Sequence, residues 1–133
     1  MDKKIKLVVG PMFSKKSFTL INDYLQDKGT KEVFKSGLDT REIGFVKSRA
    51  ITETVPCKTV KDIKEVLNSK AEHIYIDEYQ FCQAEQLLDV IKGCKEKNKK
   101  LSMYGLDYLA NGEEWASYTA IKNKVDQEVR LTA

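Results

Sequence analysis

Residues 6–17, KLVVGPMFSKKS, constrain the fold more than any other part of the chain. This stretch opens with a short apolar run, which is typical of a strand covered on both faces in a parallel sheet. The residues that follow match the phosphate-loop pattern G-x-x-x-x-G-K-S/T at Gly10, Lys16 and Ser17. Lys15 stands where that pattern has its second glycine. The stretch therefore predicts a buried strand, a tight loop and the start of a helix.

Such a loop binds phosphate because successive backbone N–H groups and the helix start point at one spot. Lys16 would reach the outer phosphates and Ser17 would hold a magnesium ion. Lys15 replaces a residue that permits close backbone approach and positive φ angles, so we expect it to weaken the anion site. An ordinary strand, turn and helix is the alternative interpretation. The candidate nucleotide-binding residues are Gly10, Pro11, Met12, Phe13, Ser14, Lys15, Lys16 and Ser17.

Composition favours one soluble domain spanning residues 1–133. The chain is 41% hydrophobic and 32% charged, and its longest apolar runs are far shorter than the roughly 20 residues of a membrane span. A net charge of +3 is too small to indicate nucleic-acid binding. Cys57, Cys82 and Cys94 form no C-x-x-C pair, so we expect free thiols and no zinc. We expect a cytoplasmic protein without a membrane or nucleic-acid partner.

The order of the predicted elements indicates an α/β fold, a three-layer arrangement with a mainly parallel sheet flanked by helices. The first helix shows apolar residues at Phe18, Ile21 and Leu25, and Gly29 is its predicted C-terminal cap. Pro56 is expected at a strand edge or end. The predicted strands cover residues 5–9, 32–34, 43–48, 51–58, 73–78, 101–106 and 129–131, and the predicted helices cover 16–28, 60–69, 84–97 and a stretch opening at Trp115.

The strand predicted over residues 73–78 ends in two carboxylates, Asp77 and Glu78. In a doubly wound sheet they would lie at the carboxyl end of the strand, beside the phosphate loop. One acid there can hold magnesium, and its neighbour can accept a proton from an attacking hydroxyl. Two acids capping a strand before a turn are the alternative. In the loop at 37–41, Asp39 and Arg41 indicate either a phosphate contact or a surface ion pair.

The ordered segments GPMFSKKS, LDTR, IDEYQF, YGLD and VRLTA span nearly the whole chain. Together they resemble the thymidine kinases of the zinc-ribbon type, whose fold is P-loop kinase-like. The resemblance implies transfer of the γ-phosphate of ATP to the 5′-hydroxyl of thymidine, with magnesium and in a homo-oligomer. Catalysis of this kind depends on positioning and charge stabilisation.

The resemblance also implies a role for each matching residue. Glu78 would be the general base, with Lys16 and Arg41 acting on the phosphates, and Asp39 would lie near them. Ser17 and Asp77 would hold magnesium. The thymidine would be contacted by Met12, Gln80, Phe81, Leu106 and Trp115.

Three departures from the family pattern favour a second interpretation. Lys15 replaces a glycine, while Ala110 and Trp115 stand at aromatic and phenylalanine positions. The family also continues past its Leu-Thr-Ala into a zinc ribbon and a lasso loop that grips the base, so we expect residues 1–133 to bind thymidine weakly. The alternative is a catalytically impaired fold, of a size suited to a bacteriophage genome, that binds a nucleotide or a protein partner.

Overall fold

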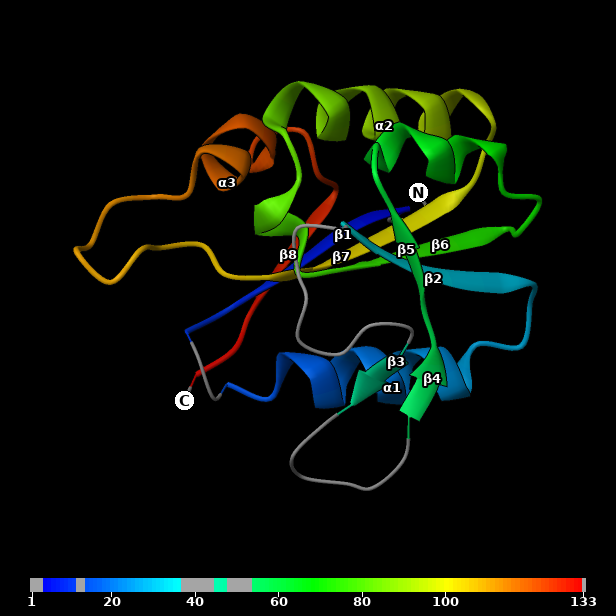
Figure 1. The fold of residues 1–133 in the computed structure, drawn as a ribbon, viewed down its shortest axis with the longest axis horizontal. Helices are drawn as coiled ribbons and strands as arrows, with labels where there is room; N and C mark the ends of the chain where they lie inside the picture. Colours follow the sequence, from blue (N-terminus) through cyan, green and yellow to red (C-terminus); the bar gives the residue numbers. More distant parts are fainter. Residues whose placement is uncertain (1–3, 12–13, 37–44, 48–53, 133) are drawn as a thin grey trace.

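A computed structural model describes residues 4–11, 14–36, 45–47 and 54–132. Six parallel strands form one sheet in the order β5-β2-β6-β7-β1-β8 (Figure 1). They are β1 (Ile5–Val9), β2 (Lys31–Ser36), β5 (Lys58–Val60), β6 (His73–Asp77), β7 (Lys100–Gly105) and β8 (Gln127–Arg130). A separate antiparallel pair consists of β3 (Phe45–Lys47) and β4 (Thr54–Pro56). The predicted α/β fold with a mainly parallel sheet is confirmed.

Helices cover both faces of the sheet and make three layers. The helix α1 (Lys16–Gln26) lies on one face, and α2 (Ala84–Glu96) and α3 (Ala116–Ile121) lie on the other (Figure 1). Side chains alternate along each strand, so every central strand contributes to two apolar clusters. Val8, Tyr75 and Tyr104 pack toward α1, while Leu7, Ile76 and Met103 pack toward α2. Burial of each large apolar side chain contributes roughly 1.5–3 kcal/mol.

The end of α1 differs from the prediction. The helix stops at Gln26, and the chain leaves through extended Asp27 (φ −75°, ψ 121°) rather than through a left-handed Gly29. The Asp27 carboxylate accepts a hydrogen bond from the Gly29 N–H at 3.0 Å, so a side chain shapes this turn. Leu25 was expected on the apolar stripe but is 54% exposed, and the buried stripe is formed by Leu20 and Ile21.

The segment after β4 also differs from the prediction. Residues 58–60 add the edge strand β5 to β2, and the helix expected over 60–69 is the 3-10 helix η1 (Ile63–Asn68). Its start is fixed by a capping box, because Asp62 accepts from the Lys64 N–H at 2.9 Å while Glu65 accepts from the Asp62 N–H at 3.0 Å. Pro56 ends β4, so its predicted place at a strand end is confirmed.

Gly93 has a packing role that propensity alone does not reveal. A Cβ at this position of α2 would lie 2.6 Å from Leu67 Cδ2, so the missing side chain lets η1 pack closely against α2. The short 3-10 helix η2 (Tyr79–Phe81), which connects β6 to α2, was not predicted. The three cysteines are free, as expected, and the structure shows that all three are buried. No helix among the described residues is long and apolar enough to cross a membrane.

Candidate functional site

The phosphate-loop residues lie at the carboxyl edge of the sheet, where β1 ends and α1 begins. Lys16 Nζ donates to the Pro11 carbonyl at 2.6 Å and to Ser14 Oγ at 3.2 Å, so its ammonium group lies against the loop. The loop is tightly packed because a Cβ on Gly10 would lie 2.6 Å from Ser14 Oγ and 2.9 Å from the Leu131 carbonyl oxygen. The Lys16 ammonium group thus lies directly against the residues of the predicted phosphate loop.

Lys15 adopts the backbone conformation that the missing glycine would favour. Its φ of 66° and ψ of 31° lie in the left-handed region, where a side chain costs about 1–2 kcal/mol. The residue is exposed and is the N-cap of α1, yet its side chain caps none of the helix N–H groups. The loop therefore has a strained backbone at Lys15, with the side chain outside the packed interior.

Asp77 is the last residue of β6. It lies two residues after Tyr75, which packs toward α1, so both side chains are on the face of the sheet that α1 covers. The carboxylate residue is only 8% exposed. One strand, β7, separates β6 from β1, so their backbones are about 10 Å apart. Asp77 and the phosphate loop are thus brought to the same edge and the same face.

Lys35 is a buried charged residue that sequence reasoning missed. It is 1% exposed and lies opposite Asp77 in the pairing of β2 with β6, so the two residues share a face. Its signal in the sequence is a lysine directly after the apolar pair Val33-Phe34. A buried ammonium group next to a buried carboxylate lowers the net charge at this part of the edge.

Glu78 follows Asp77 in a left-handed conformation, with φ of 53° and ψ of 45°. Gln80 Nε2 donates to the Glu78 carboxylate at 2.6 Å, and Gln80 Oε1 accepts from the Leu106 N–H at 3.1 Å. Strained residues of this kind occur often at functional sites. The buried Gln80 side chain therefore links the carboxylate to the segment that follows β7.

The aromatic residues predicted to contact thymidine lie together. Phe81 and Trp115 pack edge to face, with ring centroids 5.6 Å apart. Trp115 Nε1 is buried and has no hydrogen-bond partner among the described residues. The Leu106 N–H donates to Gln80, and the Leu106 carbonyl accepts a hydrogen bond from the Tyr79 hydroxyl at 2.7 Å. Leu106, Gln80, Phe81 and Trp115 thus form one contiguous group.

Some predicted site residues lie outside the described part of the chain. These are Met12 and Phe13 of the phosphate loop, and Asp39 and Arg41 of the segment after β2. Their predicted roles stay predictions. Gly10, Pro11, Ser14, Lys15, Lys16, Ser17, Asp77, Glu78, Gln80, Phe81, Leu106 and Trp115 are the predicted residues that the structure describes.

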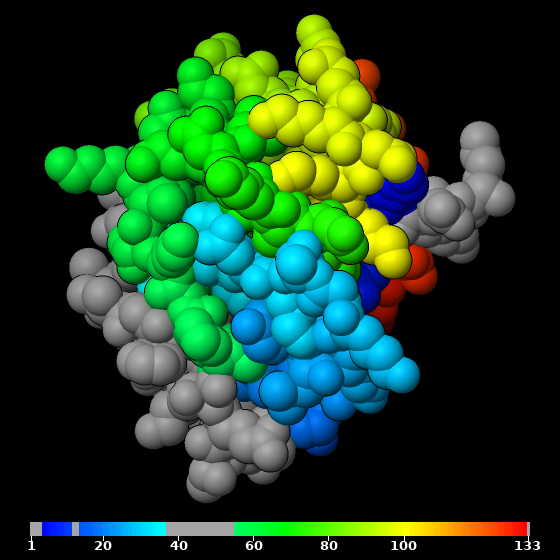
Figure 2. Space-filling view, turned by 90° about the vertical axis from the view of Figure 1, so that its right-hand side faces the viewer, coloured from blue at the N-terminus to red at the C-terminus, as the bar shows by residue number. Residues whose placement is uncertain are grey.

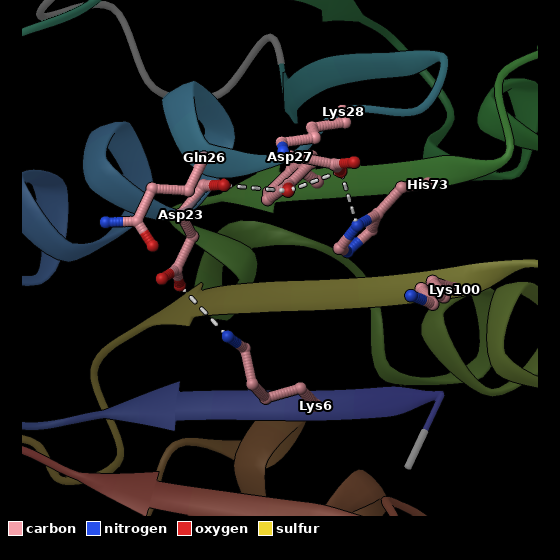
Figure 3. Close-up of a pocket in the computed structure, with 8 residues that line it drawn as sticks. Lys6, Asp23, Gln26, Asp27, Lys28, His73 and Lys100 are labelled. Atoms are coloured by element: carbon pink, nitrogen blue, oxygen red, sulfur yellow. Dashed lines mark hydrogen bonds and ion pairs between the residues drawn. The ribbon is translucent and has the colours of Figure 1, made fainter. Parts of the chain in front are cut away.

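A polar pocket lies at the opposite, amino edge of the sheet, which faces the viewer in Figure 2. It is lined by Lys6, Asp23, Gln26, Asp27, Lys28, His73, Tyr75 and Lys100 (Figure 3). His73 lies 2.8 Å from Asp27 through Nδ1 and 2.7 Å from the Ser102 hydroxyl through Nε2. Burial lowers the pKa of His73, although Asp27 acts in the opposite sense. None of the predicted site residues that the structure describes lines this pocket. Through its two hydrogen bonds, His73 of β6 connects the end of α1 to β7.

The carboxyl edge therefore combines a phosphate-loop lysine, two adjacent carboxylates and an aromatic pair. This combination can hold a polyphosphate beside a group that accepts a proton. The family model described as thymidine kinase matches residues 3–133.

Proposed function

The chain belongs to the thymidine kinase family, and on that premise we propose that it transfers the γ-phosphate of ATP to the 5′-hydroxyl of thymidine. We propose further that its site is arranged as in the zinc-ribbon type of the family. The observation that carries the proposal is the position of Glu78, next to Asp77 and hydrogen-bonded to Gln80 at 2.6 Å. The family match does not favour the alternative of an impaired binding protein.

In this proposal the residues from Gly10 to Ser17 bind the phosphates of ATP. Lys16 moves its hydrogen bonds from the Pro11 carbonyl and Ser14 hydroxyl to phosphate oxygens, which are stronger acceptors because they are charged. The first N–H groups of α1 point toward the same phosphates. Binding of this kind orients the γ-phosphate without covalent chemistry.

Ser17 and Asp77 have the hard oxygen donors that magnesium prefers. Among the described residues no three His, Cys, Asp or Glu side chains gather into a metal site. In kinases magnesium is commonly held by one or two carboxylates together with the phosphates of the nucleotide. In this proposal the ion is held by the Asp77 carboxylate, the Ser17 hydroxyl and the nucleotide. The bound ion would neutralise charge on the β- and γ-phosphate oxygens.

Glu78 would accept the proton of the thymidine 5′-hydroxyl. The 5′-oxygen then forms a bond to the γ-phosphorus, while the bond from that phosphorus to the β,γ-bridging oxygen breaks. The products are thymidine 5′-monophosphate and ADP. Gln80 would keep the Glu78 carboxylate in position, and Phe81 and Trp115 would provide apolar contact area for the base.

Labelled phosphate transfer from ATP to thymidine tests the proposal. With magnesium present we expect thymidine monophosphate to form, and we expect Lys16→Ala to lower kcat/KM by about 100-fold or more because the phosphates lose their cation. The fold should be retained, since Lys16 is only partly buried. A chain that neither forms the monophosphate nor binds Mg-ATP in calorimetry would overturn the proposal.

Replacement of Lys15 by glycine should relieve the strained backbone of the loop. We expect Lys15→Gly to raise stability by up to about 1 kcal/mol, because left-handed strain is removed while chain entropy opposes part of the gain. It should also tighten Mg-ATP binding. Lys15→Ala is the matched control, since it shortens the side chain but keeps the strain. Equal ATP affinity in all three proteins, measured by calorimetry, would show that Lys15 does not impair the loop.

A further inference from the structure

The chain from Leu106 to Trp115 forms a hairpin that projects from the carboxyl edge (Figure 1). Its two sides are joined at the root, where the Trp115 N–H donates to the Asp107 carbonyl at 2.9 Å. Farther out, the Leu109 N–H donates to the Glu113 carbonyl at 2.7 Å. The hairpin begins and ends with two of the predicted thymidine contacts, so its root determines where they lie.

Arg130, at the end of β8, binds this root. One guanidinium nitrogen, Nη1, forms an ion pair with the Asp107 carboxylate. The other, Nη2, donates to the Tyr118 hydroxyl at 3.1 Å and to the Glu128 carboxylate at 3.0 Å. The hydrogen bond to Asp107 raises the pKa of Arg130, which therefore stays charged. One side chain thus joins the hairpin root, α3 and β8.

Asp107 is buried, with 3% exposure, and its second oxygen accepts from the Tyr108 N–H at 2.9 Å. Its carboxylate therefore fixes both the ion pair and the first turn of the hairpin. Removing Arg130 would leave this buried carboxylate without its cation, which is strongly unfavourable. The expected response is a movement of Asp107 toward solvent, and the hairpin root would move with it.

The same ion pair connects the two halves of the site. Arg130 lies opposite Val9 in the pairing of β8 with β1, and Val9 directly precedes Gly10 of the phosphate loop. The hairpin root is therefore fixed to a strand adjacent to the strand that carries the loop. Neither Arg130 nor Asp107 is among the residues predicted to touch ATP or thymidine.

We infer that Arg130 and Asp107 are positioning residues that hold the hairpin of residues 106–115 in place, so that Leu106 and Trp115 meet the nucleoside. Their ion pair sets the affinity for thymidine while leaving ATP binding nearly unchanged. The thymidine part of this inference rests on the proposed function. The part that concerns the hairpin does not, because it can be measured without substrates.

The test compares the parent with Arg130→Met and Arg130→Lys. Without substrates, we expect Arg130→Met to speed hydrogen exchange at the Leu109 and Trp115 amides by about tenfold. Acrylamide should also quench the fluorescence of Trp115, the only tryptophan, more strongly. With substrates, KM for thymidine should rise about tenfold and KM for ATP less than about twofold. Arg130→Lys should give values between those of the parent and Arg130→Met, since lysine restores the charge but not the two-pronged guanidinium geometry.

Lys58→Met is the control, because it removes an ion pair with Glu32 (2.8 Å) at the far end of the sheet. It should leave hairpin exchange, quenching and both KM values as in the parent. Parent-like exchange and quenching in Arg130→Met would overturn the inference, as would equal increases in both KM values. If the parent does not phosphorylate thymidine, the proposed function and the thymidine part fail, while the exchange result still decides whether Arg130 holds the hairpin.

Discussion

Replacement of Glu78 by glutamine should lower the turnover of thymidine by about 100-fold or more, since loss of a general base costs 10²–10⁴ in rate. The amide has the shape of the carboxylate but cannot accept the 5′-hydroxyl proton. Its oxygen can still accept the hydrogen bond that Gln80 donates to Glu78 at 2.6 Å. We therefore expect the Kd for Mg-ATP to change by less than about threefold. Steady-state kinetics and calorimetry on the same preparation measure the two effects.

Glu96→Gln is the matched control because Glu96 is an exposed carboxylate at the end of α2, away from the carboxyl edge. It should turn over thymidine like the parent. A Glu78→Gln protein with more than about one third of parental turnover would remove Glu78 from the mechanism. Loss of ATP binding in that variant would instead indicate that Glu78 maintains the phosphate half of the site.

Replacement of Gly105 by alanine should destabilise the protein through a direct clash in its interior. A Cβ there would lie 2.1 Å from Gln80 Oε1 and 2.7 Å from the Tyr79 ring, and both side chains are buried. Neither can move without losing its hydrogen bond to Leu106. Overpacking of this kind costs about 3 kcal/mol. At about 3–5 °C per kcal/mol for a chain of this length, Tm should fall by roughly 10 °C.

Gly112→Ala separates this clash from backbone strain. Gly112 has a φ of 89°, but a Cβ there would meet no atom within 4 Å. The substitution should cost only about 1–2 kcal/mol from the left-handed backbone. Thermal melts of both variants provide the comparison. Similar Tm values for Gly105→Ala and Gly112→Ala would mean that the Gln80 and Tyr79 side chains can relax.

Residue patterns predicted the central strands well. The apolar runs of β1, β6 and β7 mark strands that are buried on both faces, and such runs are easily recognised. The structure of residues 58–69 was harder to predict. Their apolar spacing suits an α-helix, but Val60 extends the sheet edge and the Asp62 cap begins a 3-10 helix only afterwards. Tertiary pairing overrode local periodicity there.

The candidate site could be predicted only where one short segment carries it. Asp77 and Glu78 are adjacent in the sequence, so a single strand end reveals both. Lys35 and Arg130 acquire their neighbours through strand register, which no local pattern specifies. The need for glycine at position 93 of α2 is hidden from local patterns for the same reason, because the side chain that packs against it belongs to Leu67.

The strand order has a consequence for how the protein is made. β1 lies between β7 and β8, with Ile5 opposite Leu101 and Val9 opposite Arg130. Synthesis adds roughly 5–20 residues per second, so on the order of ten seconds pass between the synthesis of the apolar strand β1 and that of both its partners, β7 and β8. During that time it exposes two unpaired edges, a state prone to aggregation. Gly10 packs against the Leu131 carbonyl, so this side of the loop is covered only after residue 131 has been made.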